Sequence, residues 1–142
     1  MGKIERSGFL PIIPALWASL LDICITISGQ PAGYWKGNLN IANERNPIGS
    51  FFMTNHITGI FIISGIWIVL ILILGYYLPN RISRIFLLFV LIAHSWGASS
   101  WIPKEYFFAG SLLLFLFNAI LYVLMDELSS KERLIKGTAI NH

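Results

Sequence analysis

Residues 66–74 read Ile-Trp-Ile-Val-Leu-Ile-Leu-Ile-Leu, an apolar run with no polar interruption. The run lies inside a longer apolar segment, residues 51–78, which ends with Tyr76, Tyr77 and Leu78 before Pro79. A helix rises about 1.5 Å per residue, so this segment is long enough to cross roughly 30 Å of hydrocarbon with some tilt. Paired aromatic side chains before a proline are typical of a membrane helix that ends at the headgroup level. The segment therefore predicts a transmembrane helix.

Three further apolar segments flank this one, at residues 9–28, 82–102 and 106–126. The chain is 56% hydrophobic and only 12% charged, and its mean hydropathy is +0.70. A soluble domain of 142 residues cannot bury that much apolar surface in one core. We expect an all-α polytopic membrane protein in a single domain, 1–142. Short connections favour a four-helix up-down-up-down bundle, with a structured outer loop at 29–50 and a tail at 127–142.

The distribution of Lys and Arg predicts the orientation of this bundle. Seven of these residues fall on one side, namely Lys3, Arg6, Arg81, Arg84, Lys131, Arg133 and Lys136, and three on the other, namely Lys36, Arg45 and Lys104. By the positive-inside rule both termini are cytoplasmic, and a prokaryotic cytoplasmic membrane is the expected location. The net charge of +3 forms no basic face, so the expected counterions are anionic lipid headgroups rather than nucleic acid.

Asp22 is the one charged residue away from the ends of an apolar segment, since Arg84 and Asp126 lie at segment ends. An ionised side chain at the bilayer centre costs about 2.5–3.5 kcal/mol on insertion scales, so Asp22 should face the bundle interior or a wet cavity. Ala15, Ser19, Asp22 and Thr26 recur at helical spacing and form a small, polar stripe that suits an inward face.

His56 and His94 are expected at the same depth as Asp22. Counted back from the outer helix ends, all three lie about 7–12 Å inside at 1.5 Å per residue. Glu44, in the outer loop, can turn down toward them if the loop folds over the bundle mouth. Asp22, Glu44, His56 and His94 have the ligand types of a zinc, iron or manganese centre.

Two other readings of these polar residues stay open. His56 and His94 can act as the axial pair of a b-type haem, which needs one imidazole on each face. In the alternative without a cofactor, Asp22 pairs with His56 or His94 as a clasp between helices, and Asn118 adds an ordinary interhelical hydrogen bond.

The spacing Asp22-x-x-x-Thr26, followed by Glu44-x-Asn46-Pro47, resembles a pattern in small uncharacterised prokaryotic four-helix membrane proteins. The similarity covers about a third of the chain. It implies the four-helix topology and maps the family's recurring positions to Asp22, Glu44, Asn46 and Pro47. It implies no reaction, and it leaves His56 and His94 without a counterpart.

Three classes of function are compatible with the sequence. The first is a small membrane enzyme or cofactor protein whose outer-leaflet site acts on lipidic or membrane-soluble molecules. The second is an accessory or structural subunit of a larger membrane complex, or a homo-oligomer. The third is an oligomeric channel in which Asp22 is the ion or proton site. The sequence does not decide whether the protein is an enzyme.

Overall fold

The computed structural model describes residues 8–139, with side chains up to residue 135, and every element in this range is a helix. In chain order the elements are η1 Leu10–Ile12, α1 Ile13–Ser28, α2 Ala32–Trp35, η2 Leu39–Ile41, α3 Pro47–Asn55, α4 Gly59–Tyr77, α5 Asn80–Ser99 and α6 Phe107–Ala139. Four stretches, η1 with α1, α4, α5 and α6, are long and apolar enough to cross a membrane. The predicted all-helical fold with four apolar helices is confirmed.

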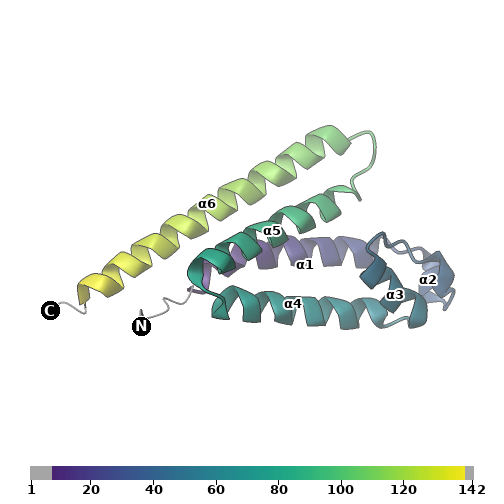
Figure 1. The fold of residues 1–142 in the computed structure, drawn as a ribbon. Coiled ribbons are helices and arrows are strands. Elements are labelled where there is room, and N and C mark those ends of the chain that lie inside the picture. The colour runs from purple at the N-terminus through teal and green to yellow at the C-terminus, as the bar shows by residue number, and fades with distance from the viewer. Residues whose placement is uncertain (1–7, 140–142) are drawn as a thin grey trace.

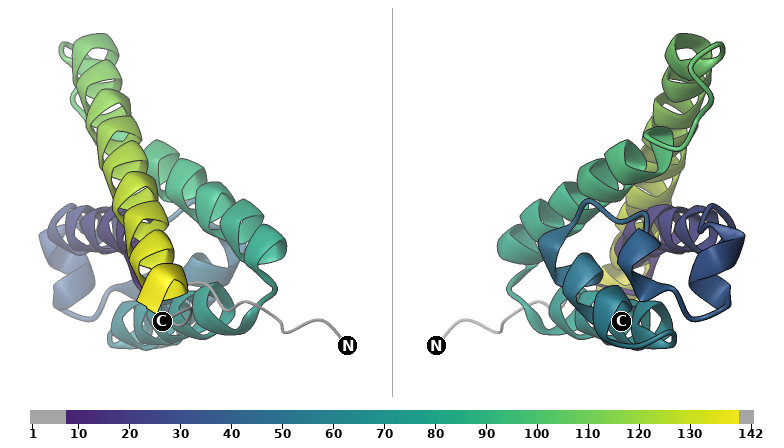
Figure 2. Two further views of the ribbon diagram at one scale, coloured as in Figure 1. Left: turned by 90° about the vertical axis from the view of Figure 1, so that its left-hand side faces the viewer. Right: turned by 90° about the vertical axis from the view of Figure 1, so that its right-hand side faces the viewer.

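The helices α1 and α5 form the central pair of the molecule, and α4 and α6 each contact both of them (Figure 1). Within the described residues α4 and α6 do not contact each other. Figure 2 shows the N-terminal end of α6 diverging from the other helices. Buried residues of α1 are small, among them Ala15, Ala18 and Ser19, and small side chains let helices approach closely.

Two apolar clusters hold the described chain together. One joins η1, α1, α4 and α5 and contains Ile12, Ala15, Ile71, Leu87 and Val90. The other contains Tyr34, Met53 and Ile60, and Ile27 packs against it. We call residues 29–58 the outer cap, because this second cluster packs them onto the ends of α1 and α4. Burial of its apolar side chains explains why the cap is a folded unit rather than a linker.

A buried glutamine also ties the outer cap to α1. The Gln30 side chain donates to the carbonyls of Thr26 and Asn43, both at 3.0 Å, and accepts from the Asn43 N–H at 2.8 Å. Tyr34 is fully buried, and its hydroxyl donates to the carbonyl of Ile57 at 3.2 Å. These bonds fix both ends of the cap.

Residues 51–78, predicted as one helix, belong to two helices, α3 and α4. Asn46 starts α3, since its side chain accepts the Ile48 N–H at 3.0 Å, and Pro47 follows at the first helical position. His56 ends α3 with an extended backbone at φ −155°. The chain then turns, and a Cβ on Gly59 would lie 1.9 Å from the Phe52 carbonyl oxygen. Only glycine permits so close an approach.

The last helix also differs from its prediction. We expected it to end near residue 126, with a tail at 127–142, whereas α6 continues to Ala139. The segment after residue 126 contains good helix formers and no Pro, which is consistent with continuation of the helix. Residues 140–142 lie outside the described part of the chain, as do Met1 to Ser7. Similarly, α5 spans 80–99 rather than 82–102.

Candidate polar site

Three helices of the bundle each contribute one polar side chain to a single cluster: Asp22 from α1, Trp67 from α4 and His94 from α5. His94 Nδ1 lies 2.8 Å from Asp22 Oδ2, and the Trp67 indole nitrogen lies 2.5 Å from His94 Nε2. The Trp67 and His94 ring centroids are 6.0 Å apart. We call these residues the Asp-His-Trp cluster.

The hydrogen-bond donors of the cluster define the proton on His94. An indole N–H can only donate, so His94 Nε2 must accept and therefore carries no proton. The proton of a neutral imidazole is then on Nδ1, from which it is donated to Asp22. A second proton, on His94 Nε2, would point directly at the N–H of Trp67. The geometry thus favours a neutral His94.

The cluster is largely enclosed, with side-chain exposure of 19% for Asp22 and 17% for His94. Gly97, one turn after His94, makes this packing possible. A Cβ at Gly97 would lie 2.7 and 2.9 Å from the two carboxylate oxygens of Asp22. The carboxylate therefore lies directly against the backbone of α5, where a larger residue would displace it.

His56, the second predicted histidine ligand, is an exposed residue between α3 and α4. Its Nδ1 lies 2.7 Å from the Thr58 hydroxyl and accepts the Thr58 N–H at 3.1 Å. These contacts are local and stabilise the turn into α4. The expectation that His56 lies about one and a half turns inside a membrane helix is wrong, because α3 ends at Asn55.

Glu44, the predicted ligand from the outer loop, makes its contacts at the start of α3 and not with Asp22. Its carboxylate accepts the Asn46 N–H at 2.6 Å and packs beside Gly49 of α3. An acidic side chain at this position favours the start of a helix. Glu44 therefore organises the beginning of α3.

The four predicted metal ligands are thus not assembled in one place. Among the residues that the structure describes, no group of three or more His, Cys, Asp or Glu side chains is placed to hold a metal ion. Asp22 and His94 supply two ligands, fewer than the three or four of protein zinc sites, and Trp67 occupies the remaining nitrogen of His94. The same contact occupies the nitrogen that a haem iron would need. The residues present do not fit either group.

Trp67 and Gly97 belong to the site but were not predicted from the sequence. A tryptophan in the run 66–74 reads as an apolar residue or an interfacial anchor. Counted from the predicted segment start at residue 51, Trp67 would lie about 24 Å inside, whereas α4 starts at Gly59 and puts it about 12 Å inside, within the range estimated for Asp22 and His94.

A second polar contact joins α5 to α6. Asn118 is 3% exposed, and its amide donates to the Ser95 hydroxyl at 2.8 Å. Ser95 in turn donates to the Leu91 carbonyl. The predicted interhelical hydrogen bond of Asn118 is confirmed. Ser95 directly follows His94, so these two residues of α5 make polar contacts with three other helices, α1, α4 and α6.

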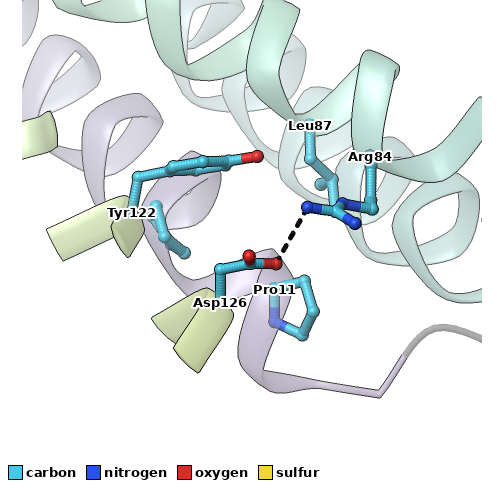
Figure 3. A pocket seen from close by; sticks show the side chains of 6 residues that line it. Pro11, Arg84, Leu87, Tyr122 and Asp126 are labelled. Atoms are coloured by element: carbon cyan, nitrogen blue, oxygen red, sulfur yellow. Dashed lines mark ion pairs between the residues drawn. The ribbon is translucent and has the colours of Figure 1, made fainter. Parts of the chain in front are cut away.

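At the opposite end from the outer cap, Arg84 of α5 forms an ion pair with Asp126 of α6 at 3.1 Å (Figure 3). The pair borders a small cavity of about 10 Å³, together with Pro11, Leu87 and Tyr122. That volume is about the room for one water molecule. Both charged side chains are more than a third exposed, so the pair contributes little stability.

No family model, no curated protein and no solved structure matches this chain.

Proposed function

We propose that the protein is inserted in a prokaryotic cytoplasmic membrane, which it crosses four times in up-down-up-down order with both termini cytoplasmic. The support is the four helices of sufficient length and hydropathy. In Figure 1, α4 and α5 are joined at the end of the bundle opposite to the junction of α5 with α6. The excess of Lys and Arg near Arg81, Arg84 and the C-terminus agrees with a cytoplasmic location of that end.

We propose further that the protein is an accessory or structural subunit of a larger membrane assembly, and that the Asp-His-Trp cluster is a clasp between its helices. One observation carries this proposal: both ring nitrogens of His94 are engaged, each by a side chain from a different helix. A histidine held in this way has no nitrogen left for a metal, a haem iron or a substrate proton. It has the contacts of a side chain that joins helices.

The surface of the long helices fits a protein that is surrounded by lipid or by other helices. Only 11% of the apolar window of α6 is buried within the chain, and Phe108, Leu113 and Leu116 are among its exposed residues. A soluble monomer rarely exposes so large an apolar surface to water. A subunit that meets neighbouring membrane helices along α6 accounts for it, as does contact with acyl chains.

The test is elemental analysis, a visible absorption spectrum and the native mass of the protein extracted from its own membrane in mild detergent. We expect no stoichiometric metal, no haem absorption and a defined species heavier than a monomer. His94→Ala should lower the thermal stability. A metal-loaded or haem-loaded monomer that loses its cofactor in His94→Ala would overturn the accessory role in favour of the cofactor hypothesis.

A further inference from the structure

The short helix α3 is separated from the membrane-spanning path of α4. The chain bends at His56 to Thr58, and α3 packs back against the first turn of α4 at Gly59. Figure 1 shows α3 at the capped end of the bundle, beside the beginning of α4. A helix at this place in a membrane protein lies near the boundary between the hydrocarbon and the headgroups.

The two sides of α3 differ in what they contact. Met53 is 1% exposed and packs into the apolar cluster with Tyr34 and Ile60. Ile48 and Phe51 are 61% and 64% exposed. Residues three apart share a helix face, so Ile48 and Phe51 form one apolar surface that no described residue of the chain covers.

The polar side chains of the last turn of α3, Thr54 and Asn55, each donate a hydrogen bond to a backbone carbonyl of the same helix. The Thr54 hydroxyl donates to the Ser50 carbonyl at 2.8 Å. The Asn55 amide donates to the Phe51 carbonyl at 2.7 Å. One donor of each side chain is therefore engaged by the helix's own backbone, which leaves fewer groups that need water.

The first turn of α4, which follows α3 and contacts it, also has exposed apolar side chains. Phe61 and Ile62, in the first turn of α4, are 51% and 49% exposed, and Phe61 packs against Trp35 of the outer cap with ring centroids 6.1 Å apart. Two exposed cationic residues of the outer cap are close to these elements in sequence: Lys36 follows Trp35, and Arg45 lies two residues before the start of α3. An apolar face bordered by aromatic and cationic side chains is the composition that lipid interfaces favour.

We infer that α3 is an interfacial helix whose Ile48 and Phe51 side chains insert among the lipid acyl chains, close to the headgroups. The partner of this surface is thus the outer lipid leaflet. The inference rests on the proposed membrane insertion of the four long helices. It deepens that proposal by assigning a lipid contact to a segment that does not span the membrane.

The experiment measures lipid access with spin labels. Cys24 is the single cysteine, so a Cys24→Ser background allows one label at a time. Labels at Ile48→Cys and Phe51→Cys are compared with Asn38→Cys, on the exposed surface of the cap, and with Val69→Cys, on the exposed side of α4. The protein is reconstituted in phosphatidylcholine and phosphatidylglycerol vesicles. Collisions are measured with oxygen, which partitions into lipid, and with a water-soluble nickel chelate.

We expect the labels at residues 48 and 51 to collide more with oxygen than with nickel, at values between those of residues 38 and 69. Nickel access equal to that of residue 38 would overturn the inference, because the face would then be in water. Low access to both reagents would also overturn it and indicate a protein partner or a second copy. Failure of the membrane proposal itself is distinguishable, since the label at residue 69 would then be open to nickel.

Discussion

The indole N–H of Trp67 donates to Nε2 of His94, and this contact determines which nitrogen of the imidazole can carry a proton. His94 Nδ1–H then faces Asp22 Oδ2 at 2.8 Å. Since His94 is neutral in this arrangement, any negative charge of the cluster belongs to Asp22. The cluster is thus a chain of directed hydrogen bonds rather than an ion pair between two charged groups.

The first prediction concerns this tautomer. Nitrogen NMR of histidine-labelled protein should show His94 protonated at Nδ1 and unprotonated at Nε2. Trp67→Phe keeps an aromatic ring but removes the N–H, so the Nε2 resonance should shift while Nδ1 stays protonated against Asp22, and the free energy of unfolding should fall by about 0.6–2 kcal/mol. His56 is the internal control, because its contacts lie in the outer cap and should not change. A wild-type His94 protonated at Nε2 would contradict the assignment.

The second prediction separates hydrogen bonding from charge at Asp22. Asp22→Asn retains a carbonyl oxygen that can accept the His94 Nδ1–H, and it removes any buried charge. We therefore expect its free energy of unfolding to stay within about 1 kcal/mol of wild type, whereas Asp22→Ala should lose roughly 1–3 kcal/mol. The measurement is reversible unfolding in mixed detergent micelles. Equal damage by the two variants would mean that the charge itself is needed.

The third prediction uses Gly97, whose added Cβ would meet the Asp22 carboxylate at 2.7 Å. Gly97→Ala should displace that carboxylate and cost about as much stability as Asp22→Ala. In an Asp22→Ala background the same change should cost almost nothing, since the carboxylate that the added Cβ would meet is gone.

Gly65→Ala is the matched control, because no atom lies within 4 Å of its added Cβ. That variant should be neutral or stabilise α4 by up to about 1 kcal/mol. Additive costs of Gly97→Ala and Asp22→Ala would refute the contact.

The fourth prediction addresses the bend between α3 and α4. Gly59→Ala places a Cβ 1.9 Å from a backbone oxygen of Phe52, which cannot rotate away. We expect α3 to separate from α4, at a cost of about 1–3 kcal/mol or more. The test is the unfolding free energy together with the mobility of a spin label on α3. An unchanged label mobility would show that the two helices do not meet at Gly59.

The four long apolar helices were predictable from the sequence because each depends on a local property, the length of an apolar run such as 66–74. The break near His56 was not predictable in this way. The stretch 54–59, Thr-Asn-His-Ile-Thr-Gly, is short and lies between apolar residues, and the bend depends on the approach of Gly59 to Phe52, a contact between two helices. Hydropathy does not report such contacts, so the two helices were joined into one.

The candidate site was predictable in part for a related reason. Counting residues from the helix ends gives depth, and depth placed Asp22 and His94 together. It does not give the rotation of a helix about its axis or the path of a loop. Glu44 and His56 were therefore included although each makes local contacts in the outer cap. Trp67 was omitted because most of a tryptophan side chain is apolar, so a single indole N–H in an apolar run does not suggest a polar site.

The last prediction concerns alkaline pH and the outer cap. Burial raises the pKa of the Tyr34 phenol above its ordinary value of about 10. The folded protein therefore retains this proton at a pH where the unfolded chain has lost it. From about pH 10 upward the unfolded state binds fewer protons, so the free energy of unfolding falls until the folded phenol also ionises. Below that pH the contribution of Tyr34 is constant.

Tyr34→Phe removes this pH dependence together with the hydrogen bond to the Ile57 carbonyl. The variant should be less stable than wild type by about 0.5–1.5 kcal/mol near neutral pH, and this difference should shrink as the pH rises above about 10. All other residues are the same in both proteins, so their effects cancel in the difference. The measurement is the unfolding free energy of both proteins between about pH 7 and 11. A difference that stays constant over this range would show that folding does not change the pKa of the Tyr34 phenol, and it would contradict the burial of this hydroxyl in the cap.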